Sequence, residues 1–193
     1  MINKLVLGTV QFGLNYGINN SNGMPSEDEV FKILDTAYDN GIYNLDTADA
    51  YGNAISVIGK YHRSRHNKFN LFSKFKSVKY GEFERVVNAS LEKLDIERFE
   101  VYSYHSFKDY SDDKNIIEDL INLKKKGLVN KIGISVYTNY ELEIVVQDNF
   151  IDVIQLPFNL LDNQNLRGKL VSMARRNGKE VHARSVFPAR IVF

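Results

Sequence analysis

The chain has 193 residues, 44% of them hydrophobic, which is enough to form one sizeable core. Its formal net charge is +1, so composition gives no electrostatic case for a nucleic-acid or anionic-membrane partner. Cysteine is absent, which excludes disulfides and cysteine-bound metals and favours a reducing cytoplasm. No stretch approaches the roughly 18 apolar residues of a membrane span, and no signal-peptide pattern opens the chain. We therefore expect a single cytoplasmic domain over residues 1–193.

Short apolar runs alternate with amphipathic segments along the chain. Strands are expected at 4–10, 42–46, 69–74, 99–105, 130–135, 151–156 and 179–187. Helices are expected at 26–41, 51–61, 82–94, 115–127, 139–148 and 165–178.

The first expected helix shows how these bounds arise. Ser26 and Glu29 have the spacing of a capping box, and Gly41 is a typical helix end. Val30, Ile33, Leu34 and Ala37 recur at helical spacing, so all four are expected to face the core.

Strict alternation of strands and helices predicts a parallel sheet with helices outside it. A (β/α)8 barrel and a doubly wound open sheet both fit this pattern. The open sheet usually carries a GxGxxG loop after its first strand, and residues 8–17 (GTVQFGLNYG) lack that spacing. We therefore favour an α/β fold of the TIM-barrel type, incomplete because only about seven strands and six helices are expected.

Polar residues end three consecutive strands, at the edge where barrel enzymes carry their chemistry. These residues are Asp46, Lys74 and His105, and Tyr51 follows Asp46 by five positions. Each alone has an ordinary explanation: a helix cap, a solvated lysine, a hydrogen-bonded core histidine and one of eleven tyrosines. Their meeting at one edge instead favours a site that transfers a proton to a carbonyl oxygen.

In such a site Lys74 would lower the pKa of Tyr51 from its ordinary value near 10, and Asp46 would hold the lysine. A neutral His105 could donate a hydrogen bond to the carbonyl oxygen. One histidine with one aspartate offers too few ligands for a metal, so none is expected. A serine nucleophile is unsupported because no GxSxG motif occurs.

Five segments resemble the aldo-keto reductase superfamily. They are LGTVQFG (7–13), GIYNLDTADAYG (41–52), SLEKLDIERFEVYSYH (90–105), KKKGLVNKIGISVYT (124–138) and IDVIQLPFNLLD (151–162). The resemblance implies a (β/α)8 barrel that reduces a small carbonyl substrate to an alcohol with NADPH, or alternatively NADH. It also implies that Tyr51 is the general acid, that Asp46 and Lys74 tune it, and that His105 orients the carbonyl.

The same resemblance implies a set of cofactor contacts. Gly8, Thr9, Ser135 and Gln155 would lie near the nicotinamide, and Ser185 near the phosphates. Arg184 stands where many members carry an aromatic ring that stacks on the nicotinamide, and a guanidinium can stack there too. Val136 replaces an asparagine that is common in the family.

Compared with the family, the chain is expected to lack strand 8, the last helices and the basic loop that holds the adenosine 2′-phosphate. Exposed edges on strands 1 and 7 would then allow self-association, and NADPH binding would be weak or absent. The tail after ARSVF (183–187) departs from a related subgroup that reads Phe-Leu-Gln-Gly-Leu. Codons for Pro-Ala-Arg-Ile-Val, read after one deleted base, can encode Leu-Gln-Gly-Leu, so a frameshift is our hypothesis.

Three functional interpretations remain open from the sequence. The first is an active reductase, and the second is a truncated, inactive fragment or a non-catalytic binding module. The third is a non-redox barrel enzyme such as an epimerase, which would need a metal or a second base that the sequence does not offer.

Overall fold

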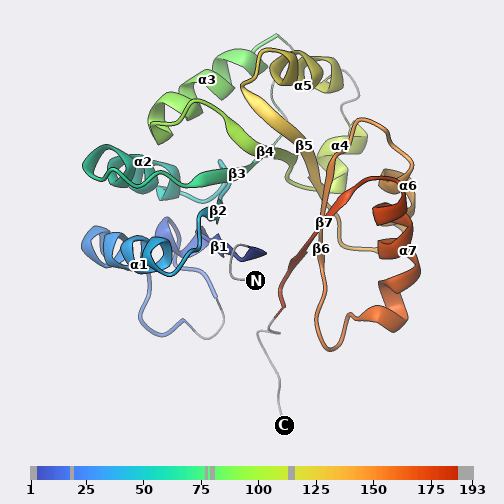
Figure 1. Cartoon of the computed structure of the whole chain (residues 1–193), viewed down its shortest axis with the longest axis horizontal. Coiled ribbons are helices and arrows are strands. Elements are labelled where there is room, and N and C mark those ends of the chain that lie inside the picture. Colours follow the sequence, from blue (N-terminus) through green and yellow to red (C-terminus); the bar gives the residue numbers. More distant parts are fainter. Residues whose placement is uncertain (1–3, 18–19, 77, 79–80, 113–115, 187–193) are drawn as a thin grey trace.

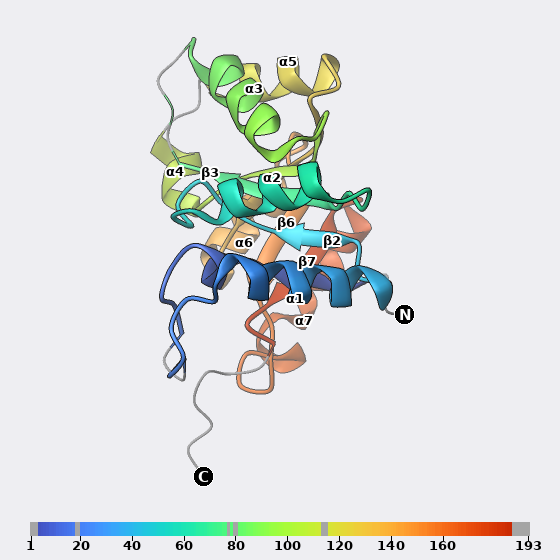
Figure 2. The ribbon, with the colours of Figure 1, turned by 90° about the vertical axis from the view of Figure 1, so that its left-hand side faces the viewer.

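A computed structural model of the chain describes residues 4–17, 20–76, 78, 81–112 and 116–186. Its seven strands form one parallel sheet in the order β1-β2-β3-β4-β5-β6-β7. The sheet curls, and the helices lie along its outer side (Figure 1). Seen from the side of the N-terminal half, α1 and α2 run next to each other over the first strands (Figure 2). This is the architecture of an incomplete (β/α)8 barrel, as predicted.

The strands are β1 (Val6–Gly8), β2 (Asn44–Asp46), β3 (Asn70–Phe75), β4 (Phe99–Tyr104), β5 (Val129–Ser135), β6 (Val153–Pro157) and β7 (Glu180–Arg184). The helices are the 3-10 helix η2 (Val10–Phe12) and α1 (Glu27–Asp39), α2 (Ala54–Ser64), α3 (Phe83–Leu94), α4 (Phe107–Asp112), α5 (Ile116–Lys125), α6 (Asn139–Val146) and α7 (Gln164–Arg176). The sequence did not predict η2 or α4, which are both short and lie in loops after strands.

Side chains that meet across the inside of the sheet show how strongly it curls. The ring of Phe72 on β3 stacks on the ring of His182 on β7, with 5.4 Å between the ring centroids. In the strand order these two strands are far apart. The curl therefore brings the last strands back over the first, and residues distant in sequence can share one site.

Local sequence signals explain the helix ends. The side chain of Ser26 accepts from the backbone N–H of Glu29, and the Glu29 carboxylate accepts from the backbone N–H of Ser26, so the predicted capping box is present. Gly41 has φ of 80°, which favours glycine after a helix. The prediction that Ile33 faces the core is wrong, since it is 40% exposed.

The core lies mainly between the sheet and the helices. Its fully buried members include Leu34 of α1, Ile58 of α2 and Leu94 of α3, which pack against strand residues such as Leu45 and Leu71. This packing fixes the strands, and thereby the residues at their carboxyl ends. Within the described residues, no helix is long and apolar enough to cross a membrane.

Candidate active site

Asp46 and Lys74 form a buried ion pair at the carboxyl ends of β2 and β3. The Nζ of Lys74 donates to Oδ1 of Asp46, and the lysine side chain is only 6% exposed. Asp46 is opposite Phe72 in the β2–β3 register, so Lys74 lies two residues further along β3, above the aspartate. The sequence prediction that these two residues pair is confirmed.

Two further hydrogen bonds link Asp46 to strands β5 and β6, which face β2 across the inside of the curled sheet. Nε2 of Gln155 on β6 donates to Oδ2 of Asp46 at 2.9 Å. Oγ of Ser135 on β5 donates in turn to Oε1 of Gln155 at 3.1 Å. Both carboxylate oxygens of Asp46 therefore have a donor, which holds the aspartate in one orientation.

Tyr51 lies in a turn before α2, three residues before the helix begins. Its backbone N–H donates to the carbonyl of Ala48, and its carbonyl accepts from the backbone N–H of Ala54, at 3.0 Å each. The sequence placed the helix start at Tyr51, and that bound is wrong by three residues.

Two glycines allow this turn to pack against the loop after β1. A Cβ on Gly13 would lie 1.9 Å from the carbonyl oxygen of Tyr51, and a Cβ on Gly52 would lie 2.2 Å from the carbonyl oxygen of Gly13. Gly52 also has φ of 53°, a conformation that favours glycine. The two loops thus touch through backbone, which fixes where Tyr51 stands.

Tyr51, Lys74 and His105 come together from three different segments. Nζ of Lys74 lies 5.6 Å from the centroid of the Tyr51 ring. The rings of Tyr51 and His105 meet edge to face, with 6.1 Å between their centroids. His105 follows the end of β4, and its backbone N–H donates to the carbonyl of Phe75 at 3.0 Å.

The predicted direction of the Tyr51 pKa shift is wrong. Burial is the largest cause and the negative charge of Asp46 the next, and together they raise the pKa of Tyr51 to about 12 against the opposing charge of the Arg184 guanidinium. The ammonium of Lys74 does not outweigh these effects in the structure, because Asp46 compensates part of its charge. The hydroxyl of Tyr51 is therefore protonated over the whole neutral pH range.

The two basic neighbours of Tyr51 have pKa values below their ordinary ones. Burial lowers the pKa of His105, and the positive charges of Lys74 and Lys76 add to this effect. Its imidazole is therefore neutral at pH 7, as predicted. Nδ1 of His105 is buried and finds no hydrogen-bond partner among the described residues. Burial also lowers the pKa of Lys74, although the pairing with Asp46 works against that shift.

The remaining predicted residues lie at or beside the same edge. A Cβ on Gly8 would meet nothing within 4 Å, so the space beside this residue is open. Thr9 is fully buried, and its backbone N–H and hydroxyl both donate to the carbonyl of Asp46 at 2.9 Å, which holds the end of β2. Ser185 follows β7 with φ of 52°.

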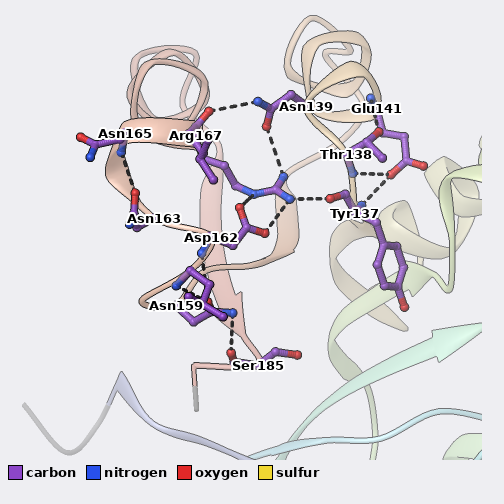
Figure 3. Close-up of polar contacts among 12 residues, drawn as sticks. Tyr137, Thr138, Asn139, Glu141, Asn159, Asp162, Asn163, Asn165, Arg167 and Ser185 are labelled. Carbon is purple, nitrogen blue, oxygen red and sulfur yellow. Dashed lines mark hydrogen bonds and ion pairs between the residues drawn. The ribbon is translucent and has the colours of Figure 1, made fainter. Parts of the chain in front are cut away.

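Sequence reasoning missed Tyr137 and Arg167, which organise the loops after β5 and β6. Arg167 of α7 is 6% exposed and binds both carboxylate oxygens of Asp162, and its Nη2 also donates to the carbonyl of Tyr137 (Figure 3). The ring of Tyr137 lies under the Arg184 guanidinium, with 4.0 Å from Cζ to the ring centroid. No motif marks these residues, because their partners come from separate loops.

Among the described residues, the candidate site offers no set of side chains suited to binding a metal ion. The described ranges contain no group of three or more His, Asp or Glu side chains that could hold a metal ion. The donors that converge on the site are instead a phenol, an ammonium and an imidazole, which suit proton transfer and hydrogen bonding.

Known proteins show which family shares this architecture. The chain is 27% identical over 164 residues to an uncharacterized oxidoreductase of Bacillus subtilis and 26% identical over 135 residues to the chloroplastic pyridoxal reductase of Arabidopsis thaliana. These matches cover 73% and 60% of this chain and 48% and 37% of the relatives. The chain thus spans about half or less of the length of the curated relatives it matches.

Comparison with solved structures also finds aldo-keto reductases. A putative aldo-keto reductase from Pseudomonas aeruginosa superposes with a TM-score of 0.78 at 25% identity, covering 94% of this chain and 73% of that one. The holo form of an aldo-keto reductase from Bacillus halodurans gives a TM-score of 0.73 at 22% identity, covering 94% and 61%. The model of the aldo/keto reductase family matches residues 4–189. The chain therefore belongs to the aldo/keto reductase family of oxidoreductases.

Proposed function

We propose that this chain carries the acid–base site of a reductase that converts a small aldehyde or ketone to an alcohol with NADPH, or alternatively NADH. The observation that carries the proposal is the buried Lys74–Asp46 pair beside the rings of Tyr51 and His105. Four side chains from separate segments converge at one edge of the sheet, and none of the other three forms a hydrogen bond to the Tyr51 hydroxyl in the described structure.

In the proposed reaction Tyr51 gives its proton to the carbonyl oxygen as the carbonyl carbon is reduced. Its high pKa keeps the proton available at neutral pH. Neutral His105 offers an N–H donor to the same oxygen, which orients the carbonyl and stabilises the developing alkoxide. Asp46 keeps Lys74 charged and in place, so that the ammonium can stabilise the phenolate that Tyr51 becomes.

The residues proposed to hold a nicotinamide cofactor are Gly8, Thr9, Ser135, Gln155, Arg184 and Ser185. A nicotinamide cofactor would supply the hydride. Its carboxamide needs one donor and one acceptor, and the described hydrogen bonds leave one N–H of Gln155 and the lone pairs of Ser135 unused. The open space beside Gly8 fits the close approach of a flat ring. In this proposal Thr9 contributes by fixing the end of β2.

Two measurements on the intact chain test this function. The first is a titration with NADPH and with NADH, followed by nicotinamide fluorescence and by thermal stabilisation of the protein. The second is reduction of 4-nitrobenzaldehyde, followed by loss of nicotinamide absorbance. We expect Tyr51→Phe to lower kcat by roughly 10²- to 10⁴-fold with the Kd for NADPH unchanged.

Tyr43→Phe is a matched control, because Tyr43 is 45% exposed and its ring packs on Tyr38. It should leave both cofactor binding and turnover unchanged. Equal turnover by wild type and Tyr51→Phe would refute the role of Tyr51. Cofactor affinity without turnover would favour the alternative of an inactive relative, and no binding of either cofactor would favour a non-catalytic binding module.

The proposal extends to partners and location. A small carbonyl compound is the proposed substrate, and neither nucleic acid nor a membrane is a proposed partner; the proposed location is the cytoplasm. Strands β1 and β7 stand at the two ends of the strand order of the described sheet. We propose that these edges allow self-association, which would appear as a concentration-dependent mass in sedimentation experiments.

A further inference from the structure

Arg184 is a cation beside the candidate active site whose charge has no partner there. Its guanidinium lies 4.0 Å above the ring of Tyr137. Its Nη2 is buried and has no hydrogen-bond acceptor among the described residues. A buried donor on a charged group is costly to leave unpaired, so a ligand that accepts from it would be stabilised.

Arg167 also contacts Tyr137, but its guanidinium has partners within the protein. It pairs with both oxygens of Asp162, and it also reaches Asn139 and the carbonyl of Tyr137 (Figure 3). The pair Arg167–Asp162 is therefore structural. Arg184 lacks any such carboxylate in the described part of the chain, although the two arginines contact the same tyrosine.

Hydrogen bonds to the backbone of Tyr137 fix the position of this residue, whose ring lies under Arg184. The backbone N–H of Tyr137 donates to Oε2 of Glu141 at 2.6 Å, and its carbonyl accepts from Arg167. The backbone N–H of Phe158 donates to the carbonyl of Arg184 at 3.1 Å, which fixes the strand end that carries the arginine. A guanidinium in contact with an aromatic face keeps its N–H donors at its edge, where a planar carboxylate can accept from them.

The charges around the site also favour an anion. Among Asp46, Tyr51, Lys74 and His105, the carboxylate is that of Asp46, and its two oxygens already accept from Lys74 and Gln155. The charge of Arg184 acts on the pKa values of both Tyr51 and Lys74. Asp46 is therefore occupied by other donors and accepts no hydrogen bond from Arg184 within the described residues.

We propose that Arg184, positioned by Tyr137, binds a carboxylate on the carbonyl substrate, so that the preferred substrates are carbonyl acids rather than neutral aldehydes and ketones. This inference rests on the proposed reductase function for turnover, but the binding of a carboxylate does not. A phosphate of the cofactor is the other anion that could be recognised by the same arginine.

Binding to the cofactor-free chain separates these cases. The probes are benzoate, its neutral isostere benzamide, and ADP-ribose, which carries the diphosphate of a dinucleotide without the nicotinamide. Affinities are measured by calorimetry for wild type, Arg184→Gln and Tyr137→Leu. We expect benzoate to bind wild type more tightly than benzamide, and Arg184→Gln to weaken benzoate roughly 10- to 100-fold with benzamide unchanged.

Tyr137→Leu should weaken benzoate by a smaller factor, because the arginine remains but loses its support, and Tyr137→Phe should bind like wild type. Thermal unfolding of each variant shows that it is folded. Equal affinity of wild type for benzoate and benzamide would overturn the proposal. So would a loss of ADP-ribose affinity in Arg184→Gln as large as the loss for benzoate, because the arginine would then bind the phosphates of the cofactor instead of a substrate carboxylate.

Measurement of turnover is the second test of the role of Arg184. Where wild type reduces aldehydes, kcat/KM for 4-formylbenzoate should exceed that for methyl 4-formylbenzoate, and Arg184→Gln should remove the difference. A preference that survives in Arg184→Gln would overturn the inference. Absence of all turnover would defeat the proposed function alone, since the binding results with benzoate still decide the role of Arg184.

Discussion

Replacing Asp46 by Asn tests whether the ion pair beneath Tyr51 is as buried as the structure shows. Asn keeps the size of the side chain and can still accept from Gln155, so the change removes mainly the charge. Lys74 is 5% exposed and would be left as a buried cation without a counter-charge. Breaking a buried pair from one side costs about 3–5 kcal/mol.

We expect the lower end of this range, about 3 kcal/mol, because the Asp46 side chain is 17% exposed and water can reach it. For a chain of this size each kcal/mol shifts Tm by about 2–4 °C, so the midpoint should fall by about 6–12 °C at pH 7. The assay is urea unfolding followed by circular dichroism, with thermal unfolding as a check.

The stability lost in Asp46→Asn should become smaller as the pH rises. Burial already lowers the pKa of Lys74, and removal of the Asp46 carboxylate lowers it further. Between that lowered pKa and the unfolded value of about 10.4, the unfolded chain binds more protons than the folded chain. The stability of Asp46→Asn should therefore rise with pH through this window. Adding Lys74→Met to Asp46→Asn removes the buried cation as well, so the double variant should regain stability.

An exposed pair supplies the control. Lys60 and Glu27 bind each other with side chains 54% and 43% exposed, so Glu27→Gln should cost less than about 1 kcal/mol. A cost for Asp46→Asn as small as that for Glu27→Gln, or a cost that does not change between pH 7 and 10, would refute the reasoning.

Three further outcomes follow from the same contacts. Gly13→Ala should cost about 1–3 kcal/mol in urea unfolding, because a Cβ there meets the Tyr51 carbonyl, whereas Gly8→Ala, with open space around it, should cost less. Stability should fall as the pH drops below about 6.5, because burial lowers the pKa of His62, and His62→Asn should weaken this dependence. Absorbance titration of the cofactor-free protein should show Tyr51, identified by difference from Tyr51→Phe, ionising with a pKa of about 12; ionisation near 10 would contradict its burial.

The sequence predicted the fold and the meeting of the four residues proposed for acid–base chemistry because both follow from local rules. Alternating strands and helices imply a parallel sheet, and parallel strands present their carboxyl ends at one edge. Asp46, Lys74 and His105 could therefore be placed together without knowing any contact. The expected tail after residue 187 lies outside the described residues, so the frameshift stays a hypothesis.

Properties that depend on burial or on long-range loop contacts could not be predicted in this way. The spacing of Asp46 and Tyr51 says nothing about how much water reaches the phenol, and burial proved to decide the direction of its pKa shift. From the sequence, Arg167 is expected to be an ordinary surface residue of a helix. It is instead buried, because it binds residues of the loops after β5 and β6. Such contacts require the tertiary arrangement that brings α7 beside the loop after β5.

The hydrogen bond from Gln155 to Asp46 links the chemistry of the site to the shape of the sheet. It joins β6 to β2, strands that are not neighbours in the sheet order, so it can form only when the sheet is curled. The same aspartate holds Lys74 beside Tyr51. Residues of β2, β3 and β6 thus pre-organise the surroundings of Tyr51. A change such as Gln155→Leu should therefore loosen both the curl of the sheet and the position of Lys74 beside Tyr51, because the Asp46 carboxylate binds Gln155 and Lys74 alike.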